Sequence, residues 1–145
     1  MKKIFIMLAI ALTTLTAFAN DNNVNSTVLT AFNKEFAGVK DVQWTSTNDF
    51  YRAEFVYNGQ NVNAFYKLDG ELLAITRNIT SLELPINLQT NLKNNYSNYW
   101  ITDLFEVSST EGTSYYITMQ KADSKVVLKS DGSGKWGMFK KMSKI

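Results

Sequence analysis

The chain has 145 residues, with 15 lysines and arginines against 13 aspartates and glutamates, and it contains neither histidine nor cysteine. The two missing residue types exclude serine–histidine and cysteine–histidine nucleophiles, disulfides, zinc sites built on imidazole or thiolate, and haem or iron–sulfur ligation by those side chains. We therefore expect no metal site and no cofactor, and a fold held together by its core alone.

The N-terminus has the pattern of a secretory signal peptide over residues 1–19. A basic start is followed by an apolar run, and Ala17 and Ala19 are the small residues that signal peptidase requires. We predict cleavage after Ala19, which makes Asn20 the first mature residue. The apolar run of about 12 residues is short of the ~20 that cross a bilayer, so an uncleaved anchor is the weaker alternative. The absence of cysteine excludes a lipoprotein anchor, and export to the periplasm or beyond is expected.

Signal removal also changes the charge, because Lys2 and Lys3 account for the excess of basic residues. The mature chain is neutral overall but uneven: from Lys121 onward there are seven lysines against Asp123 and Asp131. These lysines are spread out along the chain and no arginine lies among them, which is typical of a solvated strand face. No nucleic-acid partner is expected.

The first predicted element after the signal is a helix over residues 26–36. The polar residues 20–25 before it are expected to be disordered, and Asn25 or Ser26 can act as the N-cap. Apolar residues recur at helical spacing up to Phe36.

Beyond this helix the apolar period changes from near four to two, which indicates β-strands. Alternation is clearest from Tyr51 to Tyr57, and Asn58-Gly59 and Asp69-Gly70 are strong two-residue hairpin turns. The predicted strands cover residues 40–45, 50–57, 61–68 and 71–79.

A second helix is predicted over residues 85–96, with Pro85 in its first turn and leucines four residues apart. Strands follow at residues 101–108, 113–121, 125–129 and 135–142. The turn at residues 131–134 resembles part of a calcium loop, but it lacks the full ligand run, so we interpret it as a hairpin turn.

The same order of elements therefore occurs twice, and Phe36 and Tyr96 end the two helices about 60 residues apart. This repetition predicts an α+β fold: a tandem repeat of two helix plus four-stranded antiparallel meander units packed as one body. The expected units are residues 26–80 and residues 81–145.

The chain resembles the PepSY-like family of β-lactamase-inhibitor-like (BLIP-like) proteins of Gram-negative envelopes. The resemblance covers essentially the whole mature chain, and its motifs are the V-x-W strand Val42-Gln43-Trp44, the segment Tyr51-Arg52-Ala53-Glu54-Phe55, Ala64-Phe65-Tyr66 leading into Asp69-Gly70-Glu71, and Leu84-Pro85 at the second helix. It implies a helix-plus-sheet tandem with a protein-binding or inhibitory role. It implies no catalytic residues.

Adjacent aromatic pairs provide the candidate binding residues, because neighbours in a strand point to opposite faces of the sheet. One member of each pair can pack under a helix while the other stands on the second face, where tyrosine, tryptophan and phenylalanine are suitable interface anchors. We expect Phe50, Phe65, Tyr116 and Trp136 to be the exposed members. The open alternative is that these aromatics only cover one another.

The predicted function is therefore non-enzymatic binding of an envelope or secreted protein or peptide, plausibly as an inhibitor. A small-molecule or glycan-binding protein is an alternative, since aromatics also stack on sugar rings. A hydrolase with a carboxylate pair is a second alternative. Glu54, Glu71 and Glu106 have no supporting motif for it, and Glu54 shares a strand face with Arg52.

Overall fold

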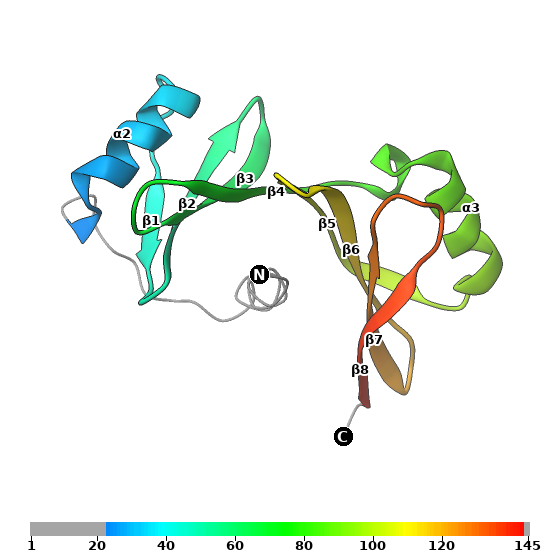
Figure 1. The fold of residues 1–145 in the computed structure, drawn as a ribbon. Coiled ribbons are helices and arrows are strands. Elements are labelled where there is room, and N and C mark those ends of the chain that lie inside the picture. The colour runs from blue at the N-terminus through cyan, green and yellow to red at the C-terminus, as the bar shows by residue number, and fades with distance from the viewer. Residues whose placement is uncertain (1–22, 144–145) are drawn as a thin grey trace.

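The computed structural model describes residues 23–143, so the predicted signal and its cleavage site at Ala17, Ala19 and Asn20 lie outside the described residues. Over those described residues, two α-helices and eight strands make up the fold (Figure 1). In chain order the elements are α2 (Ser26–Glu35), β1 (Gln43–Ser46), β2 (Phe50–Tyr57), β3 (Gln60–Lys67), β4 (Leu72–Asn78), the 3-10 helix η2 (Ser81–Glu83), α3 (Ile86–Asn95), β5 (Trp100–Ser109), β6 (Gly112–Gln120), β7 (Ser124–Ser130) and β8 (Gly137–Ser143).

The eight strands form one antiparallel sheet in which each strand pairs with the next one along the chain. The pairing includes β4 with β5, from Ala74↔Ser109 to Asn78↔Phe105, although η2 and α3 separate these two strands in the sequence. Backbone hydrogen bonds therefore continue across the middle of the molecule.

This continuity corrects the predicted fold class. The two helices and eight strands are confirmed as elements, but the expected α+β tandem of two helix plus four-stranded units is wrong. Between residues 23 and 143 the chain is mostly β, with one eight-stranded sheet and two short α-helices. The local patterns show where strands are, whereas the β4–β5 pairing depends on residues that lie far apart in the sequence.

Helix α2 begins at a side-chain cap. Asn25 Oδ1 accepts a hydrogen bond from the backbone N–H of Val28 at 2.9 Å, and its amide donates to the Leu68 carbonyl at 2.7 Å. Val24 is buried in the core beside the helix. The disorder expected for residues 20–25 therefore does not extend to Val24 and Asn25, because both are tied to the folded body.

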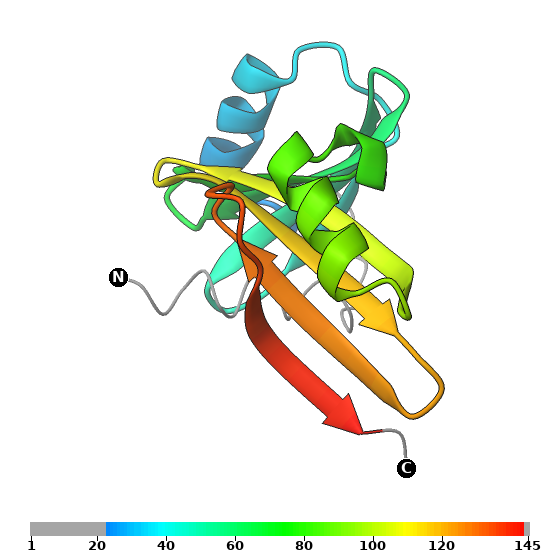
Figure 2. The same cartoon turned by 90° about the vertical axis from the view of Figure 1, so that its right-hand side faces the viewer.

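Helix α3 is introduced by η2, where Thr80 and Glu83 form a capping box. Pro85 occupies the N-cap position of α3 and makes no side-chain cap hydrogen bond. The helix buries Leu88 and Leu92 against the second half of the sheet, and Figure 2 shows it lying over that half.

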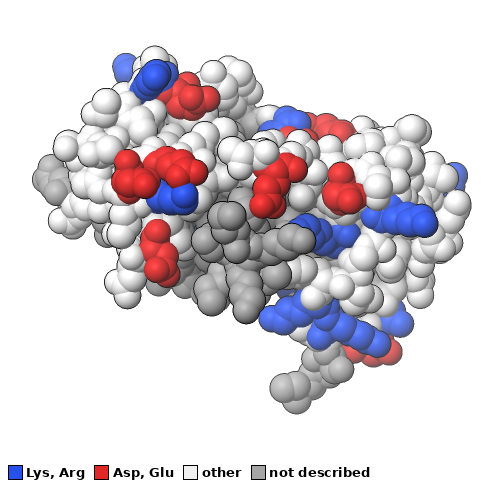
Figure 3. Space-filling view, viewed as in Figure 1, with Lys and Arg blue, Asp and Glu red and all other residues white. Residues whose placement is uncertain are grey.

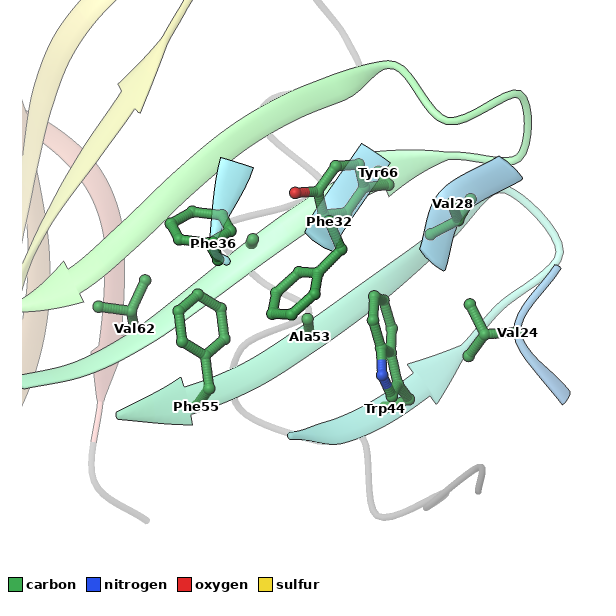
Figure 4. Close-up of a cluster of buried hydrophobic side chains, with 10 residues drawn as sticks. Val24, Val28, Phe32, Phe36, Trp44, Ala53, Phe55, Val62 and Tyr66 are labelled. Carbon is green, nitrogen blue, oxygen red and sulfur yellow. The ribbon is translucent and has the colours of Figure 1, made fainter. Parts of the chain in front are cut away.

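Each helix covers its own core, and the two cores differ in composition. The core under α2 is rich in aromatic residues (Figure 4): Val24, Val28, Phe32, Phe36, Trp44, Ala53, Phe55, Val62, Ala64 and Tyr66. The core under α3 is mainly aliphatic: Ile79, Leu84, Leu88, Leu92, Leu104, Ile117, Met119, Val126 and Leu128.

Both helices lie on the same face of the sheet. Cross-strand register connects Val62 of the α2 core through Arg77 and Glu106 to Tyr115, which packs against the α3 core. The sheet bends at β4 and β5, and its two halves descend from there (Figure 1). We call the side opposite α2 and α3 the inner face, because it lies on the inside of this bend.

Candidate functional site

The inner face carries an apolar cluster that crosses most of the sheet. Its buried members are Phe65, Ala74, Phe105, Val107 and Tyr116, and its partly buried members are Phe50, Leu73 and Phe139. These side chains come from β2, β3, β4, β5, β6 and β8, so the cluster exists only because the two halves form one sheet. We call this set the inner-face cluster.

The rings of the inner-face cluster pack against one another. Phe105 and Tyr116 are paired across β5 and β6 and are stacked, with centroids 5.3 Å apart and planes 8° apart. The ring of Phe139 lies nearly perpendicular to that of Tyr116, with centroids 5.4 Å apart, and the ring centroids of Phe50 and Phe65 are 5.8 Å apart. Lys129 Nζ lies 5.3 Å from the centre of the Tyr116 ring, at cation–π distance.

The structure brings together three of the four aromatic residues that the sequence singled out. Phe50, Phe65 and Tyr116 are all in the inner-face cluster. The exposure expected for Phe65 and Tyr116 is wrong, because each is at most 3% exposed and packs against neighbouring rings. Strand alternation thus predicts the sheet face of these residues correctly, but it does not predict that one aromatic ring covers another.

Trp136 lies on the other side of the sheet from these three. It packs against the α3 core, and its indole N–H donates to the Leu88 carbonyl at 3.3 Å. The face expected for it is wrong, because Trp136 precedes the first residue of β8, Gly137, and strand alternation does not apply to it.

The sequence reasoning missed Phe105 and Phe139 as members of this cluster. Phe105 alternates with Leu104, which packs under α3, so the same rule that selected Phe65 could have selected it. Phe139 was harder to find, because the β7–β8 register shifts between Val127 and Leu128.

A polar strip lies beside the inner-face cluster. Arg52 and Glu54 of β2, Asn63 of β3, and Thr76 and Asn78 of β4 line a cavity of about 190 Å³ together with Asp103 and Phe105 of β5. Arg52 is buried, whereas the Glu54 side chain is about half exposed. We call this cavity the Arg52 pocket.

Another polar group occupies the opposite, helix-bearing face. Arg77 Nε donates to Glu106 Oε1 at 2.9 Å, and Arg77 Nη1 donates to Gln60 at 3.0 Å. The hydrogen bond to Glu106 raises the pKa of Arg77, and burial, with Glu106 nearby, raises the pKa of Tyr115. This network joins β3, β4, β5 and β6 between the two helices.

The two glutamates considered as a catalytic pair do not face each other. Cross-strand register places Glu54, Asn63, Thr76 and Val107 in one row on the inner face. Glu106 precedes Val107 in β5 and therefore points to the helix-bearing face, where it binds Arg77. Glu71 is paired with Lys67. A hydrolytic mechanism through Glu54 and Glu106 has no geometric basis.

Charge is unevenly distributed over the molecule. Figure 3 shows basic side chains gathered around β7 and β8, and acidic side chains over the first half and the middle. Within residues 23–143 there is no group of three or more acidic residues that could hold a metal ion. No helix in that same range is long and apolar enough to cross a membrane.

Comparison with known proteins gives similarities of structure only. Neither a family model nor a curated protein matches the chain. A protein provisionally named as periplasmic from Bacteroides eggerthii DSM 20697 is 18% identical, with a TM-score of 0.74 over 83% of this chain and 88% of that chain. A DUF2874 family protein from Bacteroides ovatus ATCC 8483 is 18% identical, with a TM-score of 0.73 over 81% and 86%.

A BLIP-like protein from Bacteroides fragilis NCTC 9343 has a TM-score of 0.69 at 15% identity, over 92% of this chain and 90% of that chain. At these identities the comparisons show a shared fold, so the chain has the fold of these Bacteroides proteins. The resemblance to BLIP-like proteins is confirmed at that level. Membership of a PepSY-like family stays a prediction.

Proposed function

We propose that this chain is an exported, non-enzymatic, inhibitor-like protein that binds a protein or peptide on the inner face of its sheet. The observation that carries the proposal is the inner-face cluster, which places aromatic side chains of β2, β3, β5, β6 and β8 beside the polar strip, on the face opposite α2 and α3. Aromatic anchors next to hydrogen-bonding groups are the chemistry of protein interfaces.

The structural neighbours support this proposal at a coarse level. One is provisionally named as periplasmic and another as BLIP-like, and neither description names an enzyme activity. The N-terminal pattern supports export, with Asn20 as the first residue of the mature chain. Intact-mass analysis of the protein recovered from the envelope would test this, and a chain that keeps residues 1–19 would contradict it.

The glycan-binding alternative is less well supported by the geometry. A sugar ring needs an open aromatic face, whereas Phe105 and Tyr116 stack on each other and Phe139 packs nearly perpendicular to Tyr116. A protein surface can instead contact the borders of such a cluster.

The test of the proposed function is affinity capture from the native envelope with matched variants. Phe50→Ala and Phe139→Ala remove the partly buried rings of the inner-face cluster. Tyr57→Ala is the control, because Tyr57 is 43% exposed and packs beside Phe36 near α2. Circular dichroism would confirm that all three variants are folded.

We expect wild type and Tyr57→Ala to capture the same protein, and Phe50→Ala and Phe139→Ala to lose it. Mass spectrometry would identify the captured protein. If both inner-face variants retain everything that wild type retains, the inner face is not the binding surface.

A further inference from the structure

Arg52 is a cationic side chain that is almost fully buried on the inner face. It stands in the middle of β2, in register with Thr45 of β1 and Phe65 of β3. Its side chain is only 8% exposed. Arginine is rarely buried to this degree without paired groups, because removing its charge from water is costly. Its surroundings are therefore expected to provide hydrogen-bond acceptors.

The folded chain provides few of them. Arg52 Nη2 donates to Thr45 Oγ1 at 3.3 Å, while the nearest oxygen of Glu54 is 3.8 Å away, beyond hydrogen-bond distance. Arg52 Nε is buried and has no partner among the residues that the structure describes. A guanidinium has five N–H donors, so much of this fork can still bind an acceptor.

Arg52 also lines a small cavity. The Arg52 pocket has a volume of about 190 Å³ and reaches from β2 to β5. Asn63 and Thr76 stand next to Glu54 in the same cross-strand row, and they add an amide and a hydroxyl donor. The ring of Phe105 forms an apolar part of the wall.

We propose that the Arg52 pocket binds a carboxylate group of the partner, which replaces Glu54 beside the guanidinium. This inference rests on the proposed function, because the partner must reach the inner face. The planar fork of arginine matches a carboxylate and can bind both of its oxygens. The Phe105 ring would contact the aliphatic part of the group that carries it.

The two acidic residues that line the pocket favour an anion of low charge over a more highly charged one. Glu54 is exposed on one side, so it can turn into water at little cost when another carboxylate arrives. Asp103 already accepts a hydrogen bond from the Asn78 amide at 3.2 Å. A phosphate dianion would be repelled by these two carboxylates more strongly than a carboxylate with a single charge.

The test uses three peptides and the purified protein. The first is a blocked tripeptide with a central glutamate, the second is the same peptide with glutamine, and the third is triglycine with a blocked amine and a free terminal carboxylate. The measured signal is the NMR resonance of the Arg52 Nε–H group during titration. The first and third peptides distinguish a side-chain carboxylate from a chain terminus.

We expect at least one carboxylate peptide to shift the Arg52 resonance and the glutamine peptide to leave it unchanged. Arg52→Lys should weaken binding by at least about tenfold, because lysine keeps the charge but loses the fork. Glu54→Gln should tighten binding, because it removes the competing charge. Since Glu54 is half exposed, this variant is expected to fold even if Arg52→Lys does not.

The inference is overturned if the glutamate and glutamine peptides give equal shifts, or if neither carboxylate peptide gives a shift. It is also overturned if Glu54→Gln binds the carboxylate peptides more weakly than wild type. The proposed function can fail separately. If Phe50→Ala and Phe139→Ala lose the partner while carboxylate peptides leave Arg52 unchanged, the inner face binds a partner without a carboxylate in this pocket. If the carboxylate peptides bind but Phe50→Ala and Phe139→Ala retain every partner, the carboxylate site in the Arg52 pocket is supported and the proposed binding surface is wrong.

Discussion

The two halves of the sheet fill the space under a helix with different chemistry. Under α2, the ring of Phe32 lies 5.1–6.4 Å from those of Phe36, Trp44, Phe55 and Tyr66. Under α3, leucine, isoleucine and valine fill the equivalent layer, and Trp136 reaches it from the border. The comparison shows that the sheet requires an apolar stripe from each helix but does not determine which apolar residues make it.

The largest expected effect on stability is that of a substitution at Phe32. We expect Phe32→Ala to lower the free energy of unfolding by about 3–5 kcal/mol, because a buried ring is lost and its four aromatic neighbours cannot close the cavity. Leu88→Ala is the matched change under α3 and should cost about 2–5 kcal/mol. Urea unfolding would measure both, and a larger loss for Leu88→Ala would contradict the expectation that the Phe32 ring contributes more to stability than the Leu88 side chain.

In each half a turn glycine lies close to the helix: Gly70 beside Thr27 of α2, and Gly134 beside Asn87 of α3. The two close approaches differ in the atoms involved. A Cβ on Gly70 would lie 3.2 Å from the Thr27 carbonyl oxygen, whereas a Cβ on Gly134 would meet the movable Asn87 side chain at 2.7 Å. Both glycines have positive φ, which alone costs roughly 1–2 kcal/mol for an alanine. Gly70→Ala should therefore be more destabilising than Gly134→Ala in thermal unfolding, and the reverse order would show that Asn87 cannot move aside.

The helices differ in their N-terminal caps. Asn25→Ala removes the cap of α2 and should cost about 1 kcal/mol or somewhat more, because the bond to the Leu68 carbonyl is lost with it. Asn94→Ala, on an exposed position of α3, is the control and should be nearly neutral. Equal unfolding midpoints for wild type and Asn25→Ala would show that the cap is unimportant.

The smallest expected effect is a gain in stability when Tyr66 is replaced by phenylalanine. Its hydroxyl is buried in the α2 core without a hydrogen-bond partner among the residues in the structure. Tyr66→Phe should raise the free energy of unfolding by about 1 kcal/mol, because an unsatisfied polar atom is removed while the ring stays. A loss of stability in urea unfolding would mean that the hydroxyl is bonded after all.

Tyr66 also gives the α2 half a pH dependence. Burial, assisted by Glu35, raises the pKa of Tyr66 from 10.0 to about 12. The unfolded chain therefore releases this proton first, so the stability that Tyr66 contributes is complete below pH 10 and falls as pH rises toward 12. Tyr66→Phe should reduce the slope of stability against pH in this window, and an unchanged slope would contradict the assignment.

The sequence was most informative about single elements. Alternation from Tyr51 to Tyr57 and the turns at Asn58-Gly59 and Asp69-Gly70 located the strands of the first half, because these are local properties. The fold class was wrong because the pairing of β4 with β5 joins residues on either side of α3, and no local pattern encodes it. Similar limits apply wherever two strands are not joined by a hairpin.

The candidate site could be predicted only in part. Adjacent aromatics in strands revealed the face of Phe50, Phe65 and Tyr116, because side chains alternate in a strand. The burial of Arg52 had no sequence signal, since its spacing from Glu54 is typical of a solvated pair on a strand face. Whether that side chain is hydrated depends on neighbours from four strands.

The joint between β4 and β5 has a consequence for the order of folding. Six of the seven strand pairs join through short turns, whereas Ala74 meets Ser109 across the whole of η2 and α3. Closing that longer loop costs more entropy, so we expect the hairpins to form early and this joint to close last. Pulsed hydrogen exchange during refolding should then show the β4–β5 amides protected after those of β2–β3 and β5–β6.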